Sequence, residues 1–358
     1  MSDVAAAGVA MTNAWVEGAL GMAAATMGGL PWGREPVALA QTARDVVMRD
    51  GPATLLRFRG SAAPRSRPLL LVPSLINRWY VLDLRPGSSL VEALVSAGLD
   101  VWCLDWGVAR DEDRYFGWDD VVARLGRAAR RVRRTTGGGY GILGYCMGAT
   151  VSAIHAALEP YDVRAFVNLA GPIDFSRGGR LTEMVDRQWF DAEAVADAGN
   201  VSPPQMQSGF VALRPTAQMA KWVGMVDRGH ALEARASFEA LERWASDNVP
   251  FPAEAYRTYI GALYQRNELA RGEHHVAGRR VSLSQITCPL MTIVAERDVI
   301  CPPEAALALE TLVGSGERDR LVVPGGHVGA VVGSRASRRL YPALAAWLAR
   351  RLDHEGAR

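Results

Sequence analysis

The sequence predicts an α/β fold with a mostly parallel central sheet, helices on both of its faces and an inserted helical cap. Short apolar runs alternate with segments of helix length, which is typical of parallel strands that are covered on both sides. A glycine-flanked turn at residues 144–148 joins one such run to a helical stretch. The alternation then stops over residues 173–251, a stretch that holds tryptophans, methionines and the breaker Ser202-Pro203-Pro204. We interpret that stretch as the cap, lying over the carboxyl edge of the sheet.

The expected strands follow directly from the apolar runs. Residues 42–59 predict a hairpin, because two alternating segments flank the turn at Asp50-Gly51. The core strands are expected at Pro68–Val72, Leu99–Leu104, Tyr140–Leu143, Ala165–Leu169, Leu290–Val294 and Asp319–Val323.

Helices are expected between these strands, at Ser89–Ala97, Asp119–Thr135 and Ala149–Leu158. The second of them begins with acidic residues and ends in a run of arginines, which is the order that the helix dipole favours. The arginine run has two interpretations. It contacts phosphates of a ligand, or it is a solvated helix end, which is the commoner role of a charge run.

The turn Gly144-Tyr145-Cys146-Met147-Gly148 has the pattern of a nucleophile elbow with cysteine at its centre. Side chains two residues before and after the centre would collide with neighbouring backbone, so glycine is needed there. The turn would hold the Cys146 sulfur above the sheet at a helix N-terminus, which favours a thiolate and an oxyanion. The alternative is a buried structural cysteine, because free cysteine often packs as a small apolar residue.

A cysteine nucleophile needs a base, and the base needs an orienting acid. In the α/β-hydrolase fold the three arrive in the order nucleophile, acid, base, at the carboxyl ends of strands. Asp298 follows the next-to-last expected strand, and His327 lies in the glycine-rich loop after the last one. They are our candidate acid and base, with Glu296 as the rival acid.

Two backbone N–H groups must stabilise the oxyanion that forms during acyl transfer. Met147, directly after the nucleophile, should supply one of them. The other is expected from the loop after the first core strand, at Ile76.

Composition excludes several other classes of protein. The 358 residues are 49% apolar and 22% charged with a net charge of +2, so no strong field attracts nucleic acid or an anionic membrane. The four cysteines lie far apart without metal-ligand spacing, which argues against zinc and favours a reducing compartment. No apolar run reaches transmembrane length, and the first residues lack the positive start of a signal peptide.

We expect three parts in the chain. Residues 1–30 form a helical leader, with an amphipathic helix over residues 10–27. Residues 31–172 and 256–358 form the hydrolase-like core, and residues 173–255 form the cap subdomain.

Several blocks together resemble polyhydroxyalkanoate synthases, the subunits that polymerise hydroxyacyl-CoA. The Gly144–Gly148 turn is similar to that family's lipase-like box with cysteine, and the resemblance extends from about residue 30 to about residue 345. The other similar blocks are Val72–Leu84, Asp105-Trp106-Gly107, Trp244–Asp247 and Tyr264–Leu269. Two positions depart from the family pattern: Ala149 replaces a common second glycine, and Val299 follows Asp298 where histidine is common.

The resemblance implies a Cys146–His327–Asp298 triad, with Met147 and Ile76 at the oxyanion. It implies a cytoplasmic enzyme at the surface of polyester granules that polymerises short 3-hydroxyacyl-CoA units, such as 3-hydroxybutyryl-CoA, without a cofactor. The short chain is similar to the two-subunit, class III-like type, which implies a non-homologous partner subunit and a homodimer. Asp298 either orients His327 or helps to activate the attacking hydroxyl. The alternatives are a thioesterase or polyester depolymerase on the same scaffold and, less favoured, a non-catalytic granule protein.

Overall fold

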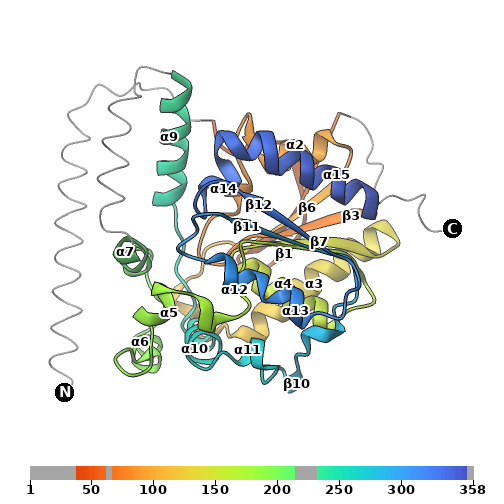
Figure 1. The fold of residues 1–358 in the computed structure, drawn as a ribbon. Helices are drawn as coiled ribbons and strands as arrows, with labels where there is room; N and C mark the ends of the chain where they lie inside the picture. Colours follow the sequence, from red (N-terminus) through yellow and green to blue (C-terminus); the bar gives the residue numbers. More distant parts are fainter. Residues whose placement is uncertain (1–37, 62–66, 214–231, 353–358) are drawn as a thin grey trace.

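The computed structural model describes residues 38–61, 67–213 and 232–352, and its centre is a single eight-stranded sheet (Figure 1). The strand order is β1-β2-β6-β3-β7-β8-β11-β12. The strands are β1 (Arg44–Asp50), β2 (Ala53–Phe58), β3 (Pro68–Val72), β6 (Asp100–Asp105), β7 (Tyr140–Tyr145), β8 (Val163–Leu169), β11 (Leu290–Ala295) and β12 (Arg318–Val323). β1 and β2 run antiparallel to their neighbours, whereas β6, β3, β7, β8, β11 and β12 are parallel. Each strand expected from the sequence is confirmed, as is the hairpin.

Helices cover both faces of this sheet, as expected. One face carries α2 (Leu90–Ser96), α14 (Gly329–Val332) and α15 (Tyr341–Leu352), and the other carries α3 (Trp118–Thr136), α4 (Met147–Leu158), α12 (Pro303–Leu307) and α13 (Leu309–Leu312) (Figure 1). Successive residues of a strand point to opposite faces. In β3, accordingly, Leu69 and Leu71 join the core under α2 and α15, while Leu70 and Val72 join the core under α3 and α4. Burial on both faces explains why this strand is an unbroken apolar run.

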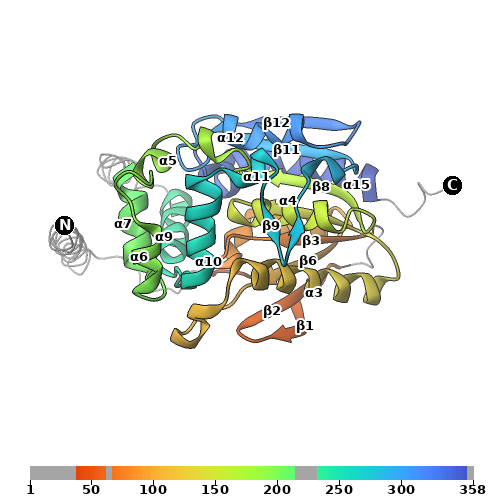
Figure 2. The same ribbon diagram turned by 90° about the horizontal axis from the view of Figure 1, so that it is seen from below.

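Where the structure describes it, the chain between β8 and β11 is mostly helical, as expected for the inserted segment. It forms α5 (Arg180–Met184), α6 (Ala192–Asp197), α7 (Pro203–Leu213), α9 (Leu232–Ser246), α10 (Ala253–Thr258), a π-helix (Tyr259–Gln265), α11 (Glu268–Arg271) and the hairpin β9 (His275–Val276) with β10 (Arg279–Arg280). Helices α5, α6, α7 and α10 gather at one end of the sheet (Figure 2). The subdomain boundaries stay a prediction, and α10 spans the second of them.

Short elements complete the described chain. They are the hairpin β4 (Asp83–Arg85) with β5 (Ser88–Ser89), the 3-10 helices Trp79–Leu82, Asp111–Tyr115, Phe175–Arg177 and Leu283–Gln285, and a π-helix at Ala336–Leu340. The leader, residues 1–30, and its expected helix lie outside the described residues. Within the described ranges no helix combines the length and the apolar character needed to cross a bilayer.

His155 on α4 is buried against the amino end of β7. Its Nε2 lies 2.6 Å from the hydroxyl of Tyr140. Burial disfavours the charged imidazolium and lowers the pKa of His155 to about 4, from an ordinary value near 6.5.

We predict that this histidine makes the fold sensitive to acid. Because its folded-state pKa lies below the unfolded one, the unfolded chain binds the proton first. The stabilisation is therefore complete above about pH 6.5 and is lost as the pH falls towards 4, by about 3 kcal/mol in total. Denaturant unfolding between these pH values should show a shallower loss for His155→Phe than for the unchanged protein. Equal slopes for the two proteins would contradict this origin.

Candidate active site

Cys146 stands at the turn between β7 and α4, in a backbone conformation that few residues other than glycine adopt. Its φ is +57° and its ψ is −131°. The N–H of Cys146 donates to Leu169 O at 3.0 Å, and its carbonyl accepts from the Ala149 N–H at 2.9 Å. The strained residue is therefore held from both sides, at the N-terminus of a twelve-residue helix.

The two glycines of the elbow are required by close backbone approaches. A Cβ on Gly144 would lie 2.2 Å from Ala149 Cα, and one on Gly148 would lie 2.0 Å from the carbonyl oxygen of Val72. Side chains at either position would push the elbow away from α4 or from the end of β3. The structure thus confirms the steric reason for glycine that the pattern predicted.

Ala149, which departs from the resembling family, is accommodated by a third glycine. A Cβ on Gly171 would lie 2.2 Å from Ala149 Cβ, 2.6 Å from Asn168 Oδ1 and 2.8 Å from the carbonyl oxygen of Cys146. The Asn168 side chain holds this turn, because it accepts from Gly171 N at 3.0 Å and donates to Gly171 O at 3.1 Å.

We therefore predict that Gly171→Ala distorts the elbow through contacts made by the turn after β8. The extra methyl group must displace Ala149 or the carbonyl of Cys146, so we expect a loss of about 2 kcal/mol in unfolding free energy and about tenfold in the reactivity of Cys146. The double variant Ala149→Gly with Gly171→Ala should recover part of both, because it removes the closest of the three contacts. Thiol alkylation rates and denaturant unfolding measure these effects, and the absence of any recovery would contradict the steric account.

The loops after β11 and β12 bring Asp298 and His327 together. Nδ1 of His327 lies 2.6 Å from Asp298 Oδ2, and their side chains are 7% and 0% exposed. Asp298 Oδ1 accepts from the N–H groups of Ile300 and Cys301, both at 2.9 Å. Because a carboxylate only accepts, Nδ1 must carry a proton, so Nε2 is the nitrogen that has a lone pair whenever the imidazole is neutral.

Cys146 lies close enough to His327 to influence the pKa of its imidazole. Nε2 of His327 is buried and makes no regular hydrogen bond to the described residues. Burial alone lowers the pKa of His327, but the negative charges of Cys146 and Asp298, and side-chain hydrogen bonding to both, raise it to about 10. The contact between Nε2 and the sulfur therefore falls outside regular hydrogen-bond geometry.

The rival acid Glu296 lies on the same loop as Asp298 but faces solvent. Its backbone N–H continues the sheet by donating to Val323 O at 2.9 Å. Of the two acids, the structure brings Asp298 to His327.

The two expected oxyanion donors come from the first residue of α4 and from the loop after β3. Met147 opens α4, where the first N–H groups have no acceptor within the helix. Ile76 lies in the loop after β3 and is 7% exposed. This loop is held by Trp106, whose Nε1 donates to Pro73 O at 2.9 Å, and by the Val249 N–H, which donates to Ile76 O at 3.2 Å.

Sequence reasoning missed three buried tyrosines that lie close to His327 or Cys146. The ring of Tyr145 stacks on His327 with centroids 5.3 Å apart. Tyr259 and Tyr264, on the inserted π-helix, have rings 5.4 Å apart. Burial raises the pKa of both tyrosines, and the nearby Cys146 adds to the shift, so that their hydroxyls stay neutral. The only hint in the sequence was that Tyr264 opens one of the resembling blocks.

Cys301, interpreted from its flanking prolines as structural, also lies close to the site. Its N–H is one of the donors to Asp298. Burial raises the pKa of the Cys301 thiol, and the charges of Asp298 and Cys146 add to that effect. Cys301 therefore stays a neutral thiol.

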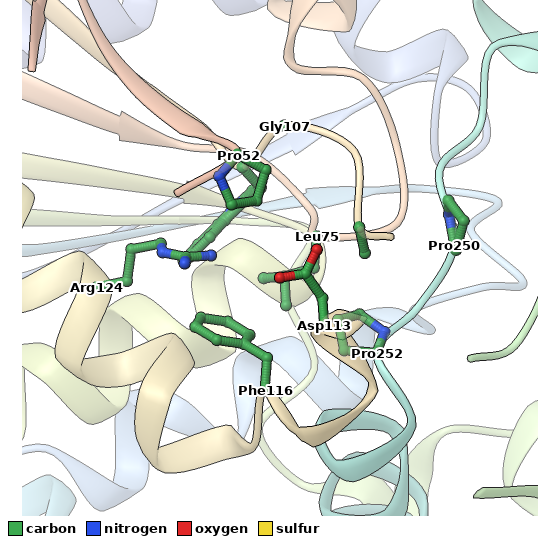
Figure 3. Close-up of a pocket in the computed structure, with 10 residues that line it drawn as sticks. Pro52, Leu75, Gly107, Asp113, Phe116, Arg124, Pro250 and Pro252 are labelled. Atoms are coloured by element: carbon green, nitrogen blue, oxygen red, sulfur yellow. The ribbon is translucent and has the colours of Figure 1, made fainter. Parts of the chain in front are cut away.

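A separate cavity is lined in part by Leu75, the residue before Ile76 in the loop after β3 (Figure 3). Its lining residues are Pro52, Leu75, Trp106, Gly107, Ala109, Asp113, Phe116, Arg124, Pro250 and Pro252, and it does not include the Cys146–His327–Asp298 group. The guanidinium of Arg124 lies 3.9 Å over the ring of Phe116, and burial lowers the pKa of this arginine. Among the described residues, no cluster of three or more His, Cys, Asp or Glu side chains is arranged so that it could hold a metal ion.

Comparison with known proteins places the chain in a family. It is 31% identical to the poly(3-hydroxyalkanoate) polymerase subunit PhaC of Allochromatium vinosum, over 85% of this chain and 88% of that protein. The chain belongs to the poly(3-hydroxyalkanoate) polymerase family. The polymerase subunits of Haloferax mediterranei and Synechocystis are 34% and 31% identical over 88% and 87% of this chain, which covers 66% and 85% of their lengths.

Two family models match this polymerase family member at its two ends. Residues 25–94 match the N-terminus of poly-beta-hydroxybutyrate polymerase (PhaC), and residues 199–351 match the C-terminus of PHB de-polymerase. Among solved structures, a hydrolase from Pseudomonas aeruginosa and a monoglyceride lipase from Saccharomyces cerevisiae both have a TM-score of 0.52. They are 14% and 11% identical, over 85% and 89% of this chain and 98% and 99% of theirs. This likeness shows that the polymerase family member has the α/β-hydrolase fold.

Several of the blocks that resemble the family in sequence make contacts with other parts of the fold. The loop after β3 contacts both Trp106 and the segment after α9. Gln265 Nε2 donates to Val185 O and Phe190 O at 2.8 and 3.0 Å, and Asn267 Nδ2 donates to Asp174 Oδ1 at 2.8 Å. The last block thus ties the end of the helical insertion to its beginning.

Proposed function

We propose that this protein is a polyhydroxyalkanoate synthase that carries its growing polyester on Cys146. The observation that carries the proposal is the alignment of three groups: a cysteine at a strained elbow, an imidazole beside it, and a buried carboxylate 2.6 Å from the far nitrogen of that imidazole. Family membership supplies the substrate class, a 3-hydroxyacyl-CoA thioester. The reaction needs no cofactor, because CoA leaves with the substrate.

The first half of the reaction loads the enzyme. His327 Nε2 takes the thiol proton, and the Cys146 thiolate attacks the carbonyl carbon of the thioester. The N–H groups of Met147 and Ile76 stabilise the oxyanion. When the bond from carbonyl carbon to CoA sulfur breaks, the imidazolium returns the proton to the leaving thiolate. Asp298 keeps the imidazole in the tautomer that this transfer needs.

The second half extends the chain. The 3-hydroxyl of the next unit attacks the acyl carbonyl on Cys146 while His327 takes its proton, and the released thiolate then takes that proton back. A thiol suits this exchange, because transfer between two thioesters is nearly balanced in free energy, whereas an ester on serine would lie lower. Asp298 orients His327 in both halves, consistent with its short contact to Nδ1.

The alternative is a hydrolase on the same scaffold, which the match of residues 199–351 to a depolymerase C-terminus favours. An assay of the purified protein distinguishes the two. With 3-hydroxybutyryl-CoA, a synthase releases CoA and forms insoluble polyester. A hydrolase releases CoA and leaves free 3-hydroxybutyrate as the only acyl product, and that result would overturn the proposal.

We further propose the setting of the enzyme from its family. The substrate units are short, the protein works in the cytoplasm at the surface of polyester granules, and it acts as a homodimer with a non-homologous partner subunit. Co-purification from cells that accumulate the polymer, followed by measurement of the mass of the complex in solution, tests the assembly. A free monomer with full activity would contradict it.

A further inference from the structure

The loop that carries Ile76 is tied to the helical insertion by a group of contacts that we call the latch. The latch joins loop residues 76–80 to residues 244–249, at the end of α9 and just beyond it. The hydroxyl of Tyr80 donates to Asp247 Oδ2 at 2.7 Å, and Nε of Arg78 lies 3.7 Å from the same oxygen. Nε1 of Trp244 donates to the carbonyl oxygen of Arg78 at 2.9 Å.

Two further contacts of the latch lie closer to Ile76. Nδ2 of Asn77 donates to Asn248 Oδ1 at 2.6 Å, and the backbone N–H of Val249 donates to Ile76 O at 3.2 Å. Nδ2 of Asn248 lies 3.3 Å from Gln207 Oε1, which extends the network to α7. The loop is thus contacted by the segment at the end of α9, and that segment is in turn contacted by α7 through Asn248.

The two aromatic side chains and the backbone contact of the latch are shielded from water, whereas Asp247 is exposed. Ile76, Tyr80 and Trp244 are each less than a tenth exposed, and Val249 is also buried. Burial raises the pKa of Tyr80, and its hydrogen bond to Asp247 raises it further, so this hydroxyl stays a donor at any physiological pH. A buried donor that lost its acceptor would be left unsatisfied, which favours the docked arrangement.

The remaining groups of the site are supported elsewhere. Cys146 is held by β7, β8 and α4, while His327 and Asp298 are held by the loops after β12 and β11. The latch contacts given above reach only one of the expected site groups, the loop of Ile76. Its loss should therefore weaken stabilisation of the oxyanion and leave the reactivity of the sulfur unchanged.

We propose that the latch positions the Ile76 amide, so that the oxyanion hole is complete only while the end of α9 is docked on the loop. Tyr80 and Asp247 are then positioning residues, and the inserted helices control the acyl-transfer step through a backbone contact. An oxyanion donor must lie within about 3 Å of the developing charge, so a shift of the loop by about 1 Å is enough to weaken it. The inference rests on the proposed function, because it assigns a task within the same reaction.

The test compares two reactions of the same thiol. Acylation by 3-hydroxybutyryl-CoA, followed as CoA release in a single turnover, needs the oxyanion hole. Alkylation of Cys146 by iodoacetamide, followed by peptide mass spectrometry, needs the thiolate but forms no carbonyl oxyanion. For Tyr80→Phe and for Asp247→Ala we expect acylation to fall about tenfold while alkylation stays within about twofold of the unchanged protein. Asp247→Asn keeps an acceptor for Tyr80 and should recover most of the acylation rate.

Tyr140→Phe is the matched control, because it removes the hydroxyl of another buried tyrosine at the opposite end of β7 from Cys146. It should leave both rates within about twofold. Unchanged acylation in Tyr80→Phe and Asp247→Ala, or an equal fall in acylation and alkylation, would overturn the latch alone. An unchanged protein that releases no CoA would overturn the proposed function, and the latch with it.

Discussion

Serine in place of Cys146 is expected to reduce CoA release from 3-hydroxybutyryl-CoA by about 1,000-fold or more. The elbow would still present its side chain to His327. A hydroxyl, however, gives up its proton far less readily than a thiol, and a serine ester is a poorer donor for the next transfer. The free energy of unfolding should change by less than about 1 kcal/mol, because Cys146 is partly exposed and serine has nearly the same shape. Steady-state CoA release and denaturant unfolding of the purified variant measure the two quantities.

Cys288→Ser is the control for this experiment. Cys288 is another partly buried free cysteine, and it takes part in none of the contacts described above for the candidate site. It should keep the rate of CoA release within about twofold. A Cys146→Ser protein with the full rate would rule out Cys146 as the nucleophile.

Asparagine in place of Asp298 is expected to lower the rate by about 1,000- to 10,000-fold through the tautomer of His327. Asp298 Oδ1 accepts two backbone N–H groups, from Ile300 and Cys301, so the amide oxygen of asparagine must take that place. The NH₂ group then faces Nδ1 of His327 and donates to it. The imidazole is forced to carry its proton on Nε2, where it can no longer accept the proton of the thiol.

The measurement is the rate of CoA release together with the NMR signature of the imidazole nitrogens, which reports the tautomer directly. Glu296→Gln removes the charge of the neighbouring, exposed carboxylate on the same loop and should leave the rate within about twofold. A small effect of Asp298→Asn with an unchanged tautomer would show that Asp298 does not orient the base.

Much of the fold and the candidate chemical groups of the site could be predicted from the sequence, because the features that indicate them are local. An unbroken apolar run such as Pro68–Val72 reflects burial on both faces of one strand. Gly144 reflects a turn whose own backbone leaves no room for a Cβ. The order nucleophile, acid, base places Cys146, Asp298 and His327 at the ends of strands that share one edge. Each of these inferences needs only neighbours in sequence and the rule that parallel strands end together.

Other features depend on distances between remote segments, and no local pattern encodes those. The contact of His327 with Asp298, the acid preferred from the sequence, and not with Glu296 depends on which carboxyl turns inward, because both lie on the same loop. The accommodation of Ala149 by Gly171 joins the elbow to the turn after β8. The latch unites residues 76–80 with residues 244–249, whose partnership a single sequence does not reveal.

The chain alone therefore predicted the architecture and the candidate reactive groups, because backbone preferences and burial periodicity act over a few residues. The tertiary structure decided which groups touch, which carboxyl lies beside His327 and which residues contact the loop of Ile76. Those outcomes depend on packing between segments far apart in the chain, where differences of about 1 Å separate a contact from none.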